Sequence, residues 1–206
     1  MDAGELDVFN LGSSDDSSSD KSSDSSKMFL KFSPRFSLDA MTGKDLSFGP
    51  VQEVYVATLF NWGGGEIGGD VNNSFWGIGS DVMVPWFGKV GMNLYGLYNI
   101  NIKDWNGFQF SMNWFKPFVH FGSTSFIAYQ GYIDYQFAAD ADSTAFVPTT
   151  DNGGVMFNGI YWHSDRYALG YGIKFYNDVY TVKDGAGVLG LESTGFSHYF
   201  AATYKF

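Results

Sequence analysis

The chain has 206 residues, of which 45% are hydrophobic and 19% aromatic, with 26 glycines, five prolines and no cysteine. This length suits one domain or a small pair, and many aromatics and glycines with few prolines are typical of β-barrels and sandwiches with tight turns. The lack of cysteine excludes disulfides and thiolate metal sites, and the formal net charge of −10 argues against a nucleic-acid partner, which needs a basic surface.

The first predicted strand is GELDVFNL, residues 4–11, and a Ser/Asp tract, SSDDSSSDKSSDSSK, follows it at residues 13–27. The tract has no apolar side chain to bury, so a solvated loop is expected. Its aspartates offer oxygen ligands for calcium, but they lack the glycine and the final glutamate of a calcium-binding loop. A loop without a metal is therefore the favoured interpretation.

The stretch MFLKFSPRFSL, residues 28–38, shows the clearest alternation in the sequence. Its apolar residues fall on one face of a predicted strand, and Lys31 and Arg35 fall on the other. Two cations that face inward are costly in a dry core but natural in a water-filled lumen. This strand therefore favours a pore, with Lys31 and Arg35 on its lining.

The next predicted strand, residues 50–62, follows a connection at residues 39–49. Its outward set is apolar, and its inward set includes Glu53 and Tyr55. A glycine-rich stretch at residues 63–73 contains a G-x-G-x-x-G pattern. No helical pattern follows it, so a flexible loop is expected there rather than a dinucleotide site.

Four further strands are predicted at residues 75–84, 89–99, 108–116 and 125–137. In the last three, apolar side chains alternate with polar and tyrosine side chains, which places the two kinds on opposite faces. The inward set comprises Asn93, Tyr95, Asn99, Gln109, Ser111, Asn113, Gln130, Tyr132, Asp134 and Gln136.

The last three strands are predicted at residues 155–162, 167–177 and 196–206. In the first, both alternating sets contain polar and apolar residues, so the sequence does not decide which set faces inward. The second presents aromatic and aliphatic side chains outward and Lys174 inward. The closing strand, FSHYFAATYKF, has aromatics at both ends of its apolar face and Tyr199 on the other. A strand that crosses a bilayer needs aromatics at its two interfaces, whereas the last strand of a soluble sandwich does not.

The ten predicted strands are joined by connections that alternate in length. Long connections lie near residues 12–27, 63–74, 100–107, 138–153 and 178–195, and shorter ones at 39–49, 85–88, 117–124 and 163–166. Outer-membrane barrels have short periplasmic turns and long external loops, and the chain has no run of about 18 apolar residues for a membrane helix. The sequence therefore predicts one antiparallel transmembrane β-barrel over residues 1–206, with 13–27 in an extracellular loop.

A resemblance to a known family lies in four blocks. They are FSPRFSLDAMTGKDLSFGPVQEVYVATLFNW (32–62), SDVMVPWFGKVG (80–91), DWNGFQFSMNWFKPF (104–118) and FNGIYWHSDRYALGYGIKFYNDVY (157–180). Here the chain resembles the nucleoside-specific channel-forming, Tsx-type outer-membrane proteins, and among them the branch of phage-receptor porins. The resemblance implies a narrow monomeric barrel in the Gram-negative outer membrane, through which nucleosides and related solutes diffuse.

The resemblance also implies partners and a full-length architecture. Such a barrel contacts outer-membrane lipid and lipopolysaccharide, is inserted by the outer-membrane assembly machinery, and can serve phage. Phe206, with Tyr204, is similar to the C-terminal signal that this machinery reads. The family barrel usually has twelve strands after a signal peptide. This sequence is expected to lack that signal and the first hairpin, which leaves open whether its strands close.

The sequence offers little support for catalysis. His163, Ser164 and Asp165 have the residue types of a hydrolase triad, but adjacent residues cannot form its relay geometry. Neither a metal-ligand spacing nor a motif that pairs two carboxylates occurs. We therefore expect no enzyme activity and no cofactor.

A diffusion channel for nucleosides needs donors, acceptors and ring faces that engage a sugar and a base weakly. The candidate pore-lining residues are Lys31, Arg35, Glu53, Tyr55, Asn93, Tyr95, Asn113, Phe115, Gln130, Tyr132, Asp134, Lys174 and Tyr199. For any one of these residues the alternative to contact with a solute is that inward polar side chains only form hydrogen bonds with one another.

Two other functions remain open at this point. The first is a barrel whose long acidic loops act mainly as a docking surface, including one for phage. The second is a soluble, lipocalin-like barrel that binds a small ligand. The soluble barrel would turn Trp114, Phe200, Tyr204 and Phe206 inward, whereas a membrane barrel turns them toward lipid.

Overall fold

The computed structural model describes residues 6–10, 28–64, 71–100, 103–140, 151–178 and 194–204. The strands are β1 (Leu6–Asn10), β2 (Met28–Phe32), β3 (Arg35–Ser37), β4 (Val51–Gly64), β5 (Val71–Val84), β6 (Gly88–Asn99), β7 (Asp104–Phe121), β8 (Ser125–Phe137), β9 (Gly153–His163), β10 (Tyr167–Asn177) and β11 (Gly195–Tyr204), and the helix is α1 (Leu38–Thr42). The predicted Ser/Asp loop at 13–27 and Phe206 lie outside the described residues, as does most of the glycine-rich loop.

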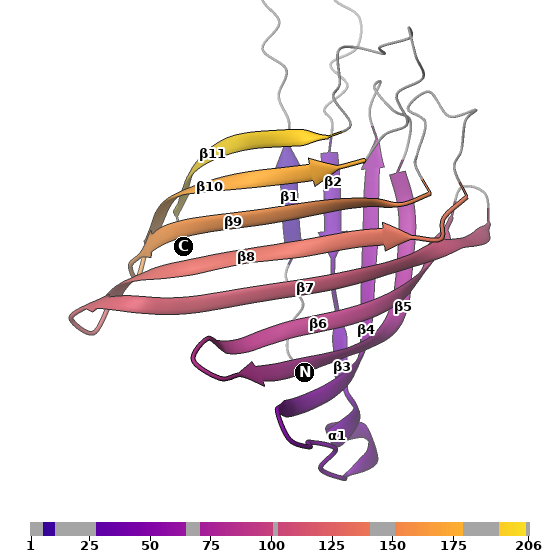
Figure 1. Cartoon of the computed structure of the whole chain (residues 1–206), viewed down its shortest axis with the longest axis horizontal. Coiled ribbons are helices and arrows are strands. Elements are labelled where there is room, and N and C mark those ends of the chain that lie inside the picture. Colours follow the sequence, from indigo (N-terminus) through magenta and orange to yellow (C-terminus); the bar gives the residue numbers. More distant parts are fainter. Residues whose placement is uncertain are drawn as a thin grey trace, which may run out of the picture.

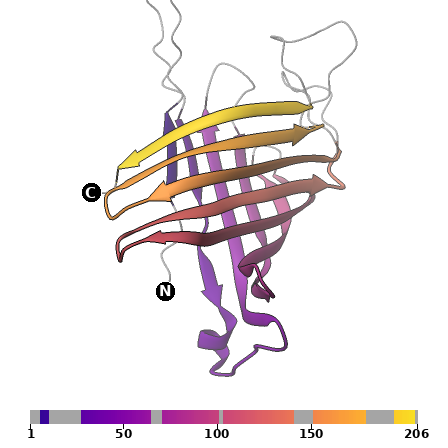
Figure 2. The same ribbon diagram turned by 60° about the vertical axis from the view of Figure 1, so that its left-hand side comes forward.

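All the strands belong to one antiparallel sheet, in which the order β1-β2-β4-β5-β6-β7-β8-β9-β10-β11 follows the chain and β3 pairs with β4 beside β2. The sheet curls strongly, so that β7–β11 run across β1, β2 and β4, which stand behind them (Figures 1 and 2). The predicted all-β barrel fold is therefore confirmed. Over the described ranges, β1 and β11 end the hydrogen-bonded path, and no pairing joins them. No helix in these ranges has the length and apolar character to cross a membrane.

The predicted strand 28–38 is two strands and the start of a helix. β2 ends at Phe32 and β3 begins at Arg35, because Pro34 has no N–H to donate to the ladder. Its carbonyl oxygen instead accepts from the Thr58 backbone N–H at 3.1 Å and from the Thr58 hydroxyl at 2.9 Å. Both strands keep one register on β4, with Lys31 opposite Asn61 and Arg35 opposite Ala57. Among the described residues the sheet thus has eleven strands, where ten are predicted.

The short helix α1 has a cap at each end. The Ser37 hydroxyl accepts from the Ala40 backbone N–H at 3.3 Å, and Gly43 ends the helix at a φ of 67°, which glycine adopts without strain. α1 projects beyond the rim of the sheet (Figure 1). In the connection to β4, hydrogen bonds from the Ser47 side chain and backbone lower the pKa of Asp45.

The strands run further than their predicted bounds. β5 begins at Val71 and β7 spans Asp104–Phe121, which leaves four residues, 100–103, between β6 and β7. β7 continues past Pro117 because its register against β8 shifts between Pro117 and Val119, where a bulge accommodates the missing N–H. The alternation of loop lengths is not strict, since the connection at 38–50 is longer than the one at 100–103, and the predicted connection 39–49 is likewise longer than 100–107.

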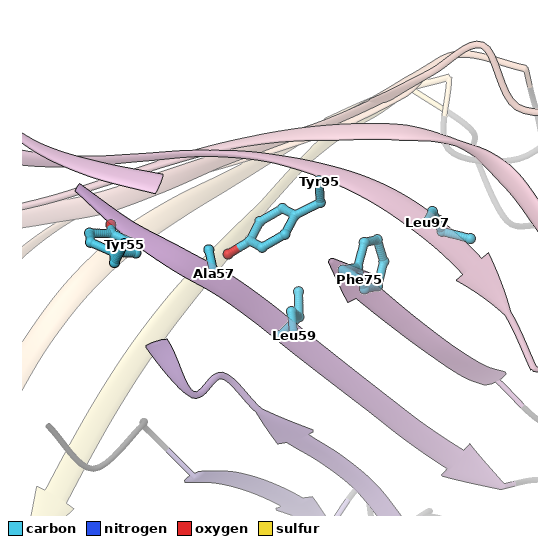
Figure 3. Packing of buried hydrophobic residues seen from close by; sticks show 6 residues of the cluster. All are labelled: Tyr55, Ala57, Leu59, Phe75, Tyr95 and Leu97. Carbon is cyan, nitrogen blue, oxygen red and sulfur yellow. The ribbon is translucent and has the colours of Figure 1, made fainter. Parts of the chain in front are cut away.

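Cross-strand register assigns each residue to one of two faces, because directly opposed residues share a face. On the concave, inner face, Tyr55 lies opposite Gly79, which lies opposite Asn93. Its buried apolar cluster lines β4, β5 and β6 and comprises Tyr55, Ala57, Leu59, Phe75, Tyr95 and Leu97 (Figure 3). On the convex, outer face of the same strands, Ile78 is 62% exposed, whereas Phe75 on the inner face is 1% exposed.

Candidate functional site

The register places all thirteen candidate pore-lining residues on the inner face. Lys31 is placed only by its backbone, opposite Asn61. Arg35, Glu53 and Tyr55 lie on β3 and β4, in a charged group that extends toward the short turn joining β5 to β6, and Asn93 and Tyr95 lie on β6. The other seven candidates lie on β7–β11. That these residues line a path for solutes remains a prediction.

Asp81 organises the charged group. Its side chain is 5% exposed, and its carboxylate accepts from the Lys89 ammonium at 2.8 Å and from the Arg35 guanidinium at 3.4 Å. The guanidinium also lies 5.1 Å from the centre of the Tyr55 ring, a distance that favours a cation–π contact. Glu53 is directly opposite Asp81 in the sheet. Two of the predicted pore-lining residues, Arg35 and Tyr55, are thus in contact, and Arg35 also pairs with Asp81, which was not among the predicted residues.

A polar chain crosses the inner face of β7 and β8. Gln109 donates to the Ser111 hydroxyl at 2.8 Å, Ser111 donates to Asp134 at 2.6 Å, and Gln136 donates to Gln109 at 3.1 Å. These four side chains form hydrogen bonds with one another, which is the alternative stated above for inward polar residues. Asn93 differs, because its buried side-chain oxygen has no hydrogen-bond partner among the residues described.

The aromatic group centres on Phe157 of β9. Its ring stacks on Tyr132 with centroids 5.9 Å apart. It also makes an edge-to-face contact with Tyr199, with centroids 6.3 Å apart, and a tilted contact with Tyr161, with centroids 6.4 Å apart. Tyr132 comes from β8 and Tyr199 from β11, and Phe157 of β9 contacts both of these predicted rings. The result is a continuous aromatic surface that extends from β8 to β11.

This surface continues toward the short turns through His163. The imidazole stacks on Phe126 at 5.0 Å, lies 5.4 Å from Phe115, and its Nε2 is 3.1 Å from the Gln130 side-chain oxygen. Phe115 and Gln130, both predicted candidates, are therefore brought together with His163, which the sequence predicts in a turn and which is the last residue of β9.

Sequence reasoning missed Asp81, Lys89, Phe157, Tyr161 and His163. The first two alternate with apolar neighbours in β5 and β6, so their inward position was readable, but nothing marked them as partners. The last three lie on β9, where both alternating sets contain aromatic side chains. Their inward position follows only from the pairing of β9 with β8 and β10.

The outer face has aromatic side chains near both ends of the strands. Toward the short turns these are Trp86, Phe121, Trp162, Tyr167 and Tyr204, and toward the other ends they are Trp105, Phe108, Phe137, Phe175 and Phe196. Between them lie exposed aliphatic side chains, among them Ile78, Leu94, Ile160 and Leu169. Two aromatic girdles around an apolar band are the distribution of a transmembrane barrel.

The expectations of a soluble barrel fail on this face. Phe200 is 85% exposed, and Tyr204 is also exposed, packing on the outer Tyr167 with centroids 5.2 Å apart. Trp114 is buried but lies in the outer register, opposite Val90. Three of the four residues that a ligand-binding barrel would turn inward therefore face outward. The fourth, Phe206, lies outside the described residues.

In the ranges that the structure describes, no three His, Cys, Asp or Glu side chains gather as metal ligands. Ser164, in the predicted turn between β9 and β10, donates its hydroxyl to the Tyr167 carbonyl at 3.2 Å and accepts from the Tyr167 N–H at 2.9 Å. Its role in the structure is to hold that turn.

Comparison with known proteins agrees with this geometry. A family model described as "Nucleoside-specific channel-forming protein, Tsx" matches residues 4–206. Outer membrane protein OmpK of Vibrio parahaemolyticus serotype O3:K6 is 62% identical over 206 residues, which cover 98% of this chain and 74% of that protein. Nucleoside-specific channel-forming protein Tsx of Escherichia coli O157:H7 is 27% identical over 203 residues, covering 88% of this chain and 68% of that protein.

Proposed function

Because this chain belongs to the Tsx family of channel-forming outer-membrane proteins, we propose that it is a diffusion channel for nucleosides and related small solutes. One observation carries the choice of solute: a continuous aromatic surface, from Tyr132 through Phe157 to Tyr199, lies on the same inner face as charged and amide side chains. A nucleoside has a flat base and a polar sugar, and this face offers a partner for each.

The stacking energies expected on this surface are suited to the diffusion of a nucleoside rather than to its tight binding. Stacking of a base on one aromatic side chain contributes about 1–3 kcal/mol, which is enough to concentrate a nucleoside and too little to trap it. Gln130 and Lys174 lie beside this surface. Gln130 is opposite Phe115 on β7 and Gly159 on β9, and Lys174 is opposite Phe157 on β9. They are the groups we assign to the hydroxyls of the sugar.

The test is swelling of liposomes that contain the purified protein. We expect adenosine and uridine to enter faster than a disaccharide of similar size, and Tyr132→Ala to reduce this preference about threefold or more, since one stacking contact is lost. Tyr135→Ala is the matched control. It removes the same side chain from the same strand, but Tyr135 faces outward and is 42% exposed, so the preference should persist.

Equal entry rates for nucleosides and sugars would contradict the proposal at once. A loss of preference in Tyr135→Ala as large as in Tyr132→Ala would also count against it, because the effect would then not come from the inner face.

We propose a second role for the external loops, as a docking surface open to phage. It is supported by the acidic Ser/Asp tract at residues 13–27 and by the length of the connections at 138–152 and 178–194. The other proposed partners are outer-membrane lipid, lipopolysaccharide and the assembly machinery, which would read the C-terminal strand.

The docking role is tested by replacing residues 13–27 with an uncharged Gly/Ser segment of equal length. We expect phage adsorption to cells that display the variant to fall about tenfold, while nucleoside entry into liposomes stays unchanged. Unchanged adsorption across a panel of phages that need the parent protein would contradict a role for this tract.

A further inference from the structure

Two inner-face rings occupy the space that side chains of neighbouring glycines would fill. A Cβ at Gly170 would lie 2.2 Å from Cδ1 and 2.3 Å from Cγ of Tyr161, and one at Gly159 would lie 2.4 Å from Cε2 of the same ring. Ordinary contacts between carbon atoms begin near 3.5 Å. Tyr161 can therefore rest against the wall only where β9 and β10 carry glycine.

Phe157 rests in the same way on Gly172. A Cβ there would lie 2.4 Å from Cζ and 2.5 Å from Cε2 of the ring, and 2.9 Å from the Asn158 carbonyl oxygen. A Cβ at Gly159 would also lie 3.0 Å from Cζ of the Phe157 ring. Three glycines on two adjacent strands thus seat two consecutive inward aromatic residues.

The register explains why these glycines and rings meet. Gly170 is directly opposite Tyr161, and Gly172 is directly opposite Gly159, so all of them point to the inner face. Neither glycine has the left-handed backbone that would require glycine on its own account. What requires glycine at these positions is the ring that covers each of them.

We propose that Gly159, Gly170 and Gly172 set the bore of the channel, by holding Tyr161 and Phe157 against the wall and out of the lumen. A methyl group at Gly170 must move the Tyr161 ring by roughly 1 Å or more, away from the wall that β9 and β10 form. This inference rests on the inner face lining a path, as proposed above, but not on which solute uses the path.

The experiment measures single-channel conductance in potassium chloride, across a planar bilayer, for Gly170→Ala. Gly170 is the cleanest of the three positions, because its three nearest atoms all belong to the Tyr161 ring. We expect conductance to fall about twofold, since a ring displaced from the wall narrows the path for ions. Potassium chloride needs no nucleoside site, so this result is independent of any preference for nucleosides.

Two further variants isolate the ring. In Tyr161→Ala/Gly170→Ala the new methyl group meets no ring, so conductance should equal that of Tyr161→Ala alone. Gly96→Ala is the outer-face control, because a Cβ there meets the Trp105 ring, at 3.1 Å, on the side that faces lipid. Its conductance should equal that of the parent protein.

The proposal is overturned if folded Gly170→Ala conducts like the parent protein, or if the double variant keeps the reduced conductance. Where Gly170→Ala alone fails to give the folded, heat-modifiable form, the proposal requires that Tyr161→Ala/Gly170→Ala folds. If the double variant fails equally while Tyr161→Ala folds, the conflict lies with the backbone rather than the ring, and the proposal is wrong.

Discussion

Replacing Phe200 with arginine is expected to destabilise the folded barrel by about 2–4 kcal/mol, whereas Tyr199→Arg is expected to leave its stability nearly unchanged. The two residues are neighbours on β11 and differ by one hydroxyl group. They face opposite sides of the sheet, so the pair separates the effect of the environment from the effect of the substitution. An arginine near the middle of a lipid-facing strand must give up its hydration.

The structure gives both residues distinct surroundings. Phe200 is 85% exposed and contacts the outer Tyr171, with ring centroids 5.0 Å apart. Tyr199 is on the inner face, where it meets Phe157, and its 43% exposure is to the concave side. An arginine at position 199 therefore stays in contact with water, and the stacked rings beside it can accept a cation.

The measurement is equilibrium unfolding in lipid vesicles with urea, followed by the loss of the folded band on unheated gels. We expect the midpoint of Phe200→Arg to fall well below that of Tyr199→Arg. Equal destabilisation of the two variants would show that the outer face does not meet lipid, and it would return the soluble, ligand-binding barrel to consideration.

The sequence was sufficient where one face meets lipid and the other does not. Tyr132 and Tyr135 illustrate this, because Ile133, Tyr135 and Phe137 form an apolar set that alternates with Tyr132, Asp134 and Gln136. A strand with two different surroundings must alternate with period two, and the register confirms the predicted faces.

β9 could not be assigned from its own residues. Phe157 and Tyr161 are aromatic like the outer Trp162, so hydrophobicity does not separate the faces. The pairing of β9 with β8 and β10 places them inward, and glycines on β9 and β10 leave room for the two rings. That relation joins residues on different strands, and a pattern within one strand does not contain it.

The break at Pro34 and the helix α1 were missed for a different reason. The alternation of residues 28–38 continues through the break, because β2 and β3 keep one register on β4. Thr58, 24 residues away, supplies the hydrogen bonds that let the chain leave the ladder at Pro34. The signal was the proline itself, which is tolerated in a sheet only at edges, strand starts and bulges.

Replacing Asp81 with asparagine is expected to shift ion selectivity toward anions and to lower stability. Asp81 forms ion pairs with both Lys89 and Arg35 on the inner face, at 2.8 and 3.4 Å. Asparagine has nearly the same shape but no charge, so both cations would keep their positions near the lumen without the carboxylate between them. Charged side chains that line a pore control which ions pass.

The magnitude follows from the exposure of the partners. Removing one member of a buried ion pair typically costs 3–5 kcal/mol, but here only the carboxylate is buried, and both cations reach solvent. We therefore expect a loss of about 1–3 kcal/mol in the free energy of unfolding. The anion-to-cation permeability ratio should rise about two- to fivefold, and high salt should reduce the change because it screens the two cations.

The measurement is the reversal potential across a bilayer with a potassium chloride gradient, for Asp81→Asn and for Asp165→Asn. Asp165 lies in the exposed turn between β9 and β10, so the control removes the same charge without touching the inner face. A third variant, Asp81→Asn/Lys89→Met, restores the local balance of charge and should return the ratio toward that of the parent protein. If Asp165→Asn shifts the reversal potential as far as Asp81→Asn, the net charge of the protein controls selectivity. The arrangement of Arg35, Asp81 and Lys89 would then serve only to tie β3 to β5 and β6.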